Sequence, residues 1–296
     1  MLRRIGGFIA AAGLTALLAG CDVGETFGGF GWPKGVSDQA KQMYDLWIGS
    51  TIAALAVGFF VWGLIFWCII RYRKRRSGAE LPIQTRFNLP IEVLYTVLPF
   101  LVIAVLFYYT AVVQTNVNKV SADAKVNVEV VAFKWNWQFN YRTGAGVAAQ
   151  TVASTTGTSE QIPILVVPVG QKIHFEEHAK DVIHSFWVPD LLFKRDVFPG
   201  SIRNEFEVTI VQEGRYVGRC AELCGTYHSM MNFEVVAVST EKYEQYVAAL
   251  KAGKPQPDAM RAMGFDGPPG SPTSPYAVTT SPFDTKRDAN LVNQEG

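Results

Sequence analysis

One short segment of the chain gathers side chains that bind transition metals. It offers two thiolates, an imidazole and a thioether, from Cys220, Cys224, His228 and Met231. Thiolate with imidazole and a weak thioether is the ligand mixture that suits copper. His184 supplies a second imidazole, and the two strands expected between it and Cys220 could fold it back beside the segment. These residues therefore predict a copper site.

The number of cysteines bears on the number of metal ions. A single-copper blue site uses one cysteine, two histidines and a weak axial ligand, so this segment has one cysteine too many. Cys220 and Cys224 can instead bridge two copper ions in a Cu2S2 diamond, with one histidine on each copper and with Met231 and a backbone carbonyl as weak outer ligands. Two alternatives stay open, a Cys220–Cys224 disulfide and a zinc site. A disulfide leaves the histidines and Met231 unexplained, and zinc sites do not ordinarily recruit methionine.

The spacing C-x-E-x-C-x3-H-x2-M over residues 220–231, preceded by D-x-x-H-S over residues 181–185, resembles the binuclear CuA motif of cytochrome c oxidase subunit II. Every position of the motif is filled, and the resemblance covers roughly residues 44–251. In that family the motif glutamate, here Glu222, binds copper through its main-chain oxygen, and its side chain also reaches a magnesium ion shared with subunit I. The copper ligands that the resemblance implies through their side chains are His184, Cys220, Cys224, His228 and Met231.

An aromatic segment at residues 133–141 alternates aromatic and polar side chains, which places Trp135, Trp137, Phe139 and Tyr141 on one face of an expected strand. Core packing explains this spacing by itself. The segment is also similar to an aromatic segment of the same family, in which the first tryptophan admits electrons from the cytochrome. The resemblance therefore implies that role for Trp135.

The remaining histidines, His174 and His178, have no partner motif around them. They are expected to be ordinary surface or sheet residues.

Two apolar runs, residues 48–70 and 93–113, contain no charged side chain. At about 1.5 Å per residue each is long enough to cross about 30 Å of hydrocarbon, and uncharged runs of this length are rare among the core helices of soluble domains. We expect two transmembrane helices. The link between them has one acid, Glu80, and the positive-inside rule places it in the cytoplasm and both flanks outside. Its basic residues are Arg71, Arg73, Lys74, Arg75, Arg76 and Arg86.

Glu92 stands at the start of the second expected span. A carboxylate in the first turn of a helix favours the helix dipole and needs no other role. The family resembled has a glutamate here at the cytoplasmic mouth of a proton path. The sequence is consistent with either role for Glu92.

The first residues are basic and are followed by an apolar run, residues 5–18, that is too short for a comfortable span, which is typical of a secretion signal. The run ends in Leu-Ala-Gly-Cys at residues 18–21, which resembles a bacterial lipobox, although an uncleaved span or a chance match is the alternative. The prediction is a signal peptide over residues 1–20, a lipidated Cys21 and an extracytoplasmic segment over residues 21–44.

From about residue 115 the pattern changes to short alternating segments separated by Gly and Pro, which predicts a β-domain over residues 115–252, a small antiparallel sandwich or Greek-key barrel. Residues 143–161 are expected to form a mobile surface insertion, residues 239–252 a short helix, and residues 253–296 an extended or disordered tail unless a partner orders it. The fold class is a helical hairpin in the membrane followed by an all-β extracytoplasmic domain, cupredoxin-like as the resemblance implies. The expected strands are residues 126–132, 135–141, 164–167, 172–176, 204–210, 215–219 and 232–238.

The resemblance implies a subunit of an oxidase in the cell membrane. It would accept electrons singly from a cytochrome c, soluble or complex-bound, and pass them to haem in subunit I, where oxygen is reduced to water with proton pumping. Subunit I would supply the haems and the second copper, and no C-x-x-C-H motif occurs for a c-type haem in this chain. Residues 186–196 look most like the actinobacterial branch, whose oxidase binds a cytochrome bc complex carrying a dihaem cytochrome c.

Three other functions fit the sequence less well. The net charge of +1, from 27 basic and 26 acidic residues, argues against a nucleic-acid partner. A quinol oxidase subunit II would share the spans and the β-domain but needs no CuA ligands. A membrane-anchored copper carrier would need exchangeable copper and no aromatic residue for electrons to enter.

Overall fold

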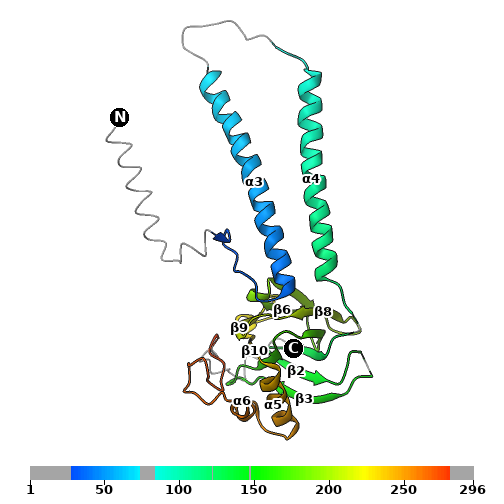
Figure 1. Ribbon diagram of the computed structural model, residues 1–296, viewed down its shortest axis with the longest axis vertical. Coiled ribbons are helices and arrows are strands. Elements are labelled where there is room, and N and C mark those ends of the chain that lie inside the picture. Colours follow the sequence, from blue (N-terminus) through cyan, green and yellow to red (C-terminus); the bar gives the residue numbers. More distant parts are fainter. Residues whose placement is uncertain (1–27, 74–83, 122, 147, 281–296) are drawn as a thin grey trace, which may run out of the picture.

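The computed structural model describes residues 28–73, 84–121, 123–146 and 148–280, in which two long helices stand on a β-domain (Figure 1). The predicted signal peptide, Cys21 and the centre of the link between the helices, including Glu80, lie outside the described residues.

Helix α3 (Asp38–Arg71) and helix α4 (Leu89–Val117) contain the two predicted spans and extend beyond them. The helix α3 starts early because Ser37 caps it: the Ser37 hydroxyl accepts a hydrogen bond from the Ala40 amide at 3.1 Å. Both helices are long and apolar enough to cross a membrane, and their apolar stretches are exposed on the chain. A core helix of a soluble domain would be covered. The chain is therefore a membrane protein that carries a β-domain.

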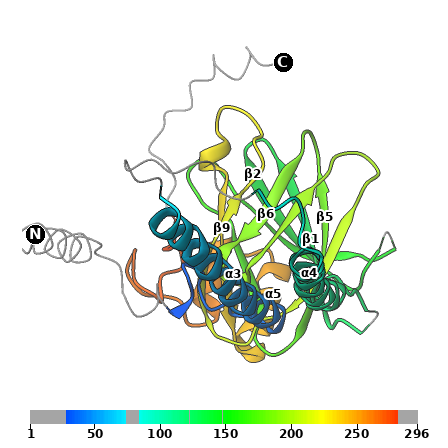
Figure 2. The same cartoon turned by 90° about the horizontal axis from the view of Figure 1, so that it is seen from above.

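The β-domain consists of two five-stranded sheets packed face to face (Figure 2). In the first sheet the order is β3-β2-β1-β5-β8, with β1 (Val126–Phe133), β2 (Asn136–Arg142), β3 (Thr151–Thr156), β5 (Lys172–Ala179) and β8 (Asn204–Thr209). In the second sheet the order is β4-β10-β9-β6-β7, with β4 (Ile164–Pro168), β6 (His184–Val188), β7 (Phe193–Val197), β9 (Gly214–Cys220) and β10 (Asn232–Val238).

The sandwich is not purely antiparallel, so the prediction was wrong on this point. Strands β1 and β5 pair in parallel, with Val126 opposite Ile173, and β4 and β10 pair in parallel, with Ile164 opposite Glu234. These strands are far apart in the sequence, and long connections rather than tight hairpins bring them together.

Three strands were missed by the hydrophobic pattern. Strand β3 lies within the segment predicted to be a mobile insertion, and that prediction is wrong for residues 151–156. Its side chains are small, and the strand is held by backbone pairing with β2, where Ala153 lies opposite Tyr141. Strands β6 and β7 are only five residues each and pair with one another.

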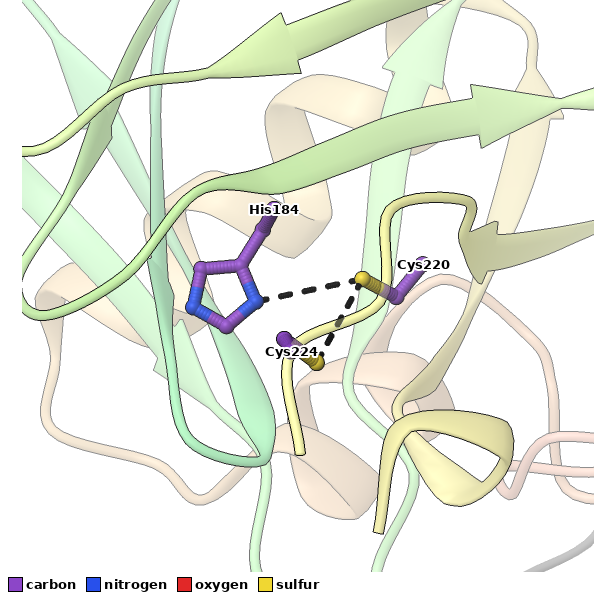
Figure 3. Close-up of side chains that lie close together, drawn as sticks. All are labelled: His184, Cys220 and Cys224. Carbon is purple, nitrogen blue, oxygen red and sulfur yellow. Dashed lines mark hydrogen bonds between the residues drawn. The ribbon is translucent and has the colours of Figure 1, made fainter. Parts of the chain in front are cut away.

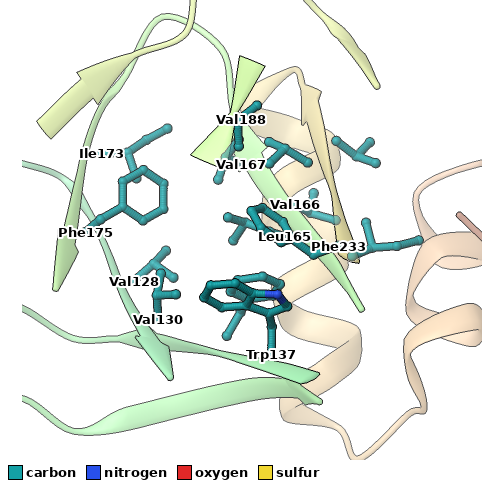
Figure 4. Close-up of a cluster of buried hydrophobic side chains, with 14 of the residues drawn as sticks. Val128, Val130, Trp137, Leu165, Val166, Val167, Ile173, Phe175, Val188 and Phe233 are labelled. Carbon is teal, nitrogen blue, oxygen red and sulfur yellow. The ribbon is translucent and has the colours of Figure 1, made fainter. Parts of the chain in front are cut away.

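The core lies between the two sheets and is rich in aromatic rings (Figure 4). Trp137 is fully buried, and its ring meets that of Phe233 edge-on with centroids 5.1 Å apart. Phe186 stacks on the same Phe233 at 4.6 Å. Each such side chain contributes about 1.5–3 kcal/mol by burial. This packing fixes β2, β6 and β10 against one another beneath the candidate site.

The first part of the predicted tail is ordered, so that prediction is wrong for residues 253–280. Helix α5 (Thr240–Lys251) is followed by helix α6 (Gln256–Ala262) and by a strap, residues 272–279, that lies on the second sheet. Arg215 donates to the carbonyls of Pro272, Ser274 and Tyr276, and Glu234 accepts from the amides of Val278 and Thr279.

Candidate metal centre

Three buried side chains converge at one end of the β-sandwich (Figure 3). His184 is the first residue of β6 and Cys220 the last of β9, and these strands are antiparallel neighbours with Phe186 opposite Cys220. Cys224 follows in the loop after β9. One ligand atom from each of the three lies within 4.8 Å of the others.

The distances between the donor atoms fit a metal centre built on two sulfurs. The Sγ atoms of Cys220 and Cys224 are 3.8 Å apart, far beyond the 2.05 Å of a disulfide bond, so both thiols are free. Nδ1 of His184 lies 3.8 Å from Sγ of Cys220, and Nδ1 of His228 lies 3.5 Å from Sγ of Cys224. Each sulfur therefore has its own imidazole.

Two weaker donors complete the cluster. The Sδ atom of Met231 lies 3.8 Å from Sγ of Cys224, and the main-chain oxygen of Glu222 lies 3.3 Å from Sγ of Cys220. Met231 is fully buried. The structure thus brings together the six residues that the sequence singled out as metal ligands, and their donor set of thiolate, imidazole, thioether and carbonyl suits copper.

Asp181 orients the ring of His184. Its Oδ1 lies 2.8 Å from Nε2 of His184, and the carboxylate also accepts the backbone amides of Lys134 and Val182, each at 2.7 Å. Burial by itself would raise the pKa of Asp181, but these hydrogen bonds hold it below its ordinary value. The ionised carboxylate favours the tautomer with the proton on Nε2, which leaves Nδ1 free to bind a metal.

The two thiols titrate as a pair in the metal-free chain. The two sulfurs share one hydrogen bond, and this bond, helped by His184, lowers the pKa of the Cys220 thiol well below its ordinary value. The same bond raises the pKa of Cys224 well above its ordinary value. One thiolate is therefore ready at neutral pH, and a metal that binds both sulfurs displaces the remaining proton.

Two tryptophans touch the site in different ways. Trp137 is a core residue whose Nε1 donates to the Met231 carbonyl at 3.2 Å. Trp135 is only half-buried, donates from Nε1 to the Cys224 carbonyl at 3.0 Å, and meets the ring of Tyr227 edge-on at 4.9 Å. A Cβ on Gly225, whose φ is +114°, would lie 3.1 Å from the Trp135 ring, so glycine permits this approach.

Sequence reasoning missed the contributions of Asp181, Tyr227 and Gly225, although Asp181 stands three residues before His184 in the motif. Glu92, by contrast, is at the start of α4, the end of the helix that is far from the β-domain (Figure 1). His174 and His178 both lie on strand β5, as expected of sheet residues.

A β-sandwich that gathers two cysteines, two histidines and a methionine at one end, and that is carried by two membrane-spanning helices, defines a membrane-anchored copper-binding domain. The family model described as "Cytochrome C oxidase subunit II, periplasmic domain" matches residues 126–238. The chain belongs to the cytochrome c oxidase subunit II family, and it is thereby a copper-binding subunit of an oxidoreductase with the cupredoxin-like domain expected of that family.

Relatives match over nearly the whole chain. A probable cytochrome c oxidase subunit 2 of Nocardia farcinica is 43% identical, with 97% of this chain and 89% of that protein covered. Cytochrome c oxidase subunit 2 of Mycobacterium tuberculosis is 38% identical, with 97% and 90% covered. Among solved structures, the periplasmic domain of subunit II of cytochrome oxidase of Bradyrhizobium japonicum is 23% identical with a TM-score of 0.39, covering 44% of this chain and 96% of that chain.

Proposed function

We propose that this chain accepts electrons one at a time from a cytochrome c at a binuclear copper centre and passes them to haem in subunit I, where oxygen is reduced to water with proton pumping. The observation that carries the proposal is the pair of free, buried sulfurs 3.8 Å apart, each with its own imidazole. The proposed copper ligands are His184, Cys220, Glu222 through its carbonyl, Cys224, His228 and Met231.

The arrangement favours two coppers over one. A single blue copper uses one thiolate, whereas here the second sulfur is as buried as the first and has an imidazole of its own. A bound two-copper centre supplies one-electron chemistry in which the charge is shared by both metals. The protein supplies rigidity: Asp181 fixes His184, and paired strands β6 and β9 fix the spacing between His184 and Cys220.

Trp135 is the proposed point at which electrons enter. Its indole is half-buried, and its hydrogen bond to the Cys224 carbonyl links the surface of the domain to a proposed ligand. The neighbouring Leu223 is 78% exposed, which leaves this edge of the loop open to a redox partner. The proposed donor is a soluble cytochrome c or the dihaem cytochrome c of a cytochrome bc complex.

Three finer assignments rest on the family or on the sequence pattern rather than on this cluster. The carbonyl of Glu222 faces Cys220, which leaves its carboxylate for a magnesium ion shared with subunit I. Cys21 is proposed to carry the lipid anchor. Glu92 is proposed to open a proton path, and its contacts support a structural duty as well: Glu92 Oε1 accepts the Asn88 amide at 2.9 Å, and Asn88 caps the helix.

Two other functions fit less well. A quinol oxidase subunit would have no use for the cluster of copper ligands. A copper carrier needs ligands that exchange metal readily, whereas His184, Cys224 and Met231 are all buried.

The EPR spectrum of the purified full-length chain loaded with copper tests the proposal. One electron shared by two equivalent copper nuclei gives a seven-line hyperfine pattern, and Cys220→Ser or Cys224→Ser should abolish it. Met231→Leu should keep both coppers and shift the potential, because an axial thioether is a weak ligand. A four-line pattern at one copper per chain would rule out the binuclear centre.

A further inference from the structure

A short aromatic turn, residues 28–32, folds against the outside of α3 (Figure 1). The ring of Trp32 stacks on that of Trp47, with centroids 4.8 Å apart and planes 10° from parallel. Nε1 of Trp47 donates to the Gly29 carbonyl at 3.0 Å, and the Trp32 amide donates to the same carbonyl at 3.1 Å, which closes the turn. The aromatic turn is thus fixed at the level of Trp47.

That level is the outer boundary of the hydrocarbon layer. Asp45 is the last charged residue of α3 before the apolar span, and Ile48 is the first residue of the uncharged run. From there the run to residue 70 covers about 34 Å at about 1.5 Å per residue, enough for one bilayer core. On the aqueous side, Asn116 of α4 donates to Gln42 of α3. Trp47 therefore lies where the helix passes from water into lipid.

The rings of the aromatic turn face outward. Phe30 is 40% exposed and Trp32 is 38% exposed although one face of its ring is covered by Trp47. The turn contains no charged or polar side chain, only glycines and these two aromatics. Exposed aromatic side chains of this kind are typical of membrane–water interfaces, where tryptophan is enriched.

Contacts with the β-domain and with helix α3 together fix the position of the aromatic turn. Val36, four residues after Trp32, is hydrogen-bonded through its backbone to Asp190 and Val211 of the β-domain. On α3 the turn covers the face that carries Tyr44 and Trp47, whose side chains reach the Gly28 and Gly29 carbonyls. The groove between α3 and α4 is lined by other residues of α3, among them Gln42, Leu46, Gly49 and Ala53.

We propose that the aromatic turn is a lipid-binding contact in which Phe30 and Trp32 insert among the headgroups of the outer leaflet and set the height of the β-domain above the membrane. The occupant is lipid because the exposed rings continue the lipid-exposed surface of α3 at the same depth and carry no charge to select another partner. The proposed lipidated Cys21 lies seven residues before Gly28, at most about 25 Å of extended chain. The contact itself does not depend on that anchor or on the copper assignment.

Spin-label accessibility in the assembled oxidase tests the proposal. Single labels are placed at Phe30→Cys, Lys34→Cys and Phe59→Cys in a Cys68→Ser background, and the Cys68→Ser chain without a new cysteine is the blank. The complex is held in phosphatidylcholine nanodiscs, and relaxation by dissolved oxygen is compared with relaxation by a water-soluble nickel chelate. Lys34 is an exposed residue of the same segment, and Phe59 is 75% exposed within the span.

The label at residue 30 should respond more to oxygen and less to nickel than the label at Lys34, and less to oxygen than the label at Phe59. A response equal to that of Lys34 would place the turn in water and overturn the proposal. Poor access to both reagents would show a protein neighbour on the turn and would overturn it equally. The copper EPR signal of the same samples reports the metal centre separately, so a failure of one assignment is distinguishable from a failure of the other.

Discussion

Nε2 of His184 and Oδ1 of Asp181 lie 2.8 Å apart, and this contact turns the opposite nitrogen of the ring toward Cys220. The carboxylate belongs to the loop before β6, and it also binds the Lys134 amide, one residue before Trp135. Asp181 therefore binds both a proposed copper ligand and the backbone next to Trp135, the proposed point at which electrons enter.

Asp181→Ala should lower copper affinity by about 10–100-fold, as is typical when the carboxylate behind a metal-binding histidine is removed. Competition with a copper chelator measures this directly. Asp123→Ala is the control, because Asp123 is an exposed carboxylate paired with Lys172, away from the site. Unchanged copper affinity in Asp181→Ala would show that the contact does not support the ligand.

Trp135→Gln should slow reduction of the copper centre by the donor cytochrome by orders of magnitude while leaving the copper spectrum and the melting temperature nearly unchanged. Stopped-flow reduction beside thermal melts separates the two effects. Trp137→Gln is the matched comparison, because Trp137 is fully buried and its truncation should cost about 3–5 kcal/mol of stability. Equal slowing in both variants, or slowing that follows destabilisation, would remove Trp135 from the electron path.

The attachment of the strap, residues 272–279, to the second sheet should depend on Glu234. Its Oε2 accepts hydrogen bonds from the Val278 and Thr279 amides, and its Oε1 accepts one from Nε of Arg215 at 2.7 Å. Glu234→Gln leaves the buried Arg215 without its counter-charge, a change that typically costs about 3–5 kcal/mol. Limited proteolysis should then cut near residues 272–279 much faster than in the parent chain. Glu241→Gln, on the exposed face of α5, should leave the cleavage rate unchanged.

The parts of this structure that follow from local pattern could be predicted from the sequence. The two spans were predicted because an uncharged run of that length has few other places to fold. Cys220, Cys224, His228 and Met231 were grouped because one loop carries them. Their geometry with His184 depends on the pairing of β6 with β9. Strand β6 has only five residues, and the hydrophobic pattern of the sequence did not predict it.

The ordered tail was not predictable for a related reason. Residues 272–279 have the composition of a disordered segment, and the groups that hold them, Arg215 and Glu234, are 44 to 61 residues away in the sequence. Strand β5 shows the same limit. The expected strand ended at Glu176, yet β5 continues to Ala179 with Glu177 fully buried.

Glu177 supplies the last prediction. Both of its carboxyl oxygens are buried without a hydrogen-bond partner, and burial raises its pKa well above the ordinary value of 4.5, although Arg195 opposes this shift. The folded chain therefore keeps the proton at pH values where the unfolded chain releases it. Folding stability should fall as pH rises above about 4.5, and the loss should continue until the pH reaches the pKa of the folded state.

Glu177→Gln removes this proton linkage while keeping the size of the side chain. Relative to the parent chain, the variant should gain up to about 1.4 kcal/mol of unfolding free energy per pH unit above pH 4.5, with no pH-dependent difference below it. Burying the amide adds a cost that does not change with pH and shifts the difference in unfolding free energy by the same amount at every pH. The quantity to measure is therefore the slope of that difference against pH, obtained from the melting of the β-domain in both chains.

Glu176→Gln is the neighbouring control: Glu176 faces the other side of β5 and pairs with Arg142 at 2.9 Å, so the substitution should lower stability at pH 7. A difference between Glu177→Gln and the parent that is flat from pH 4 to pH 8 would show that Glu177 is ionised in the folded protein.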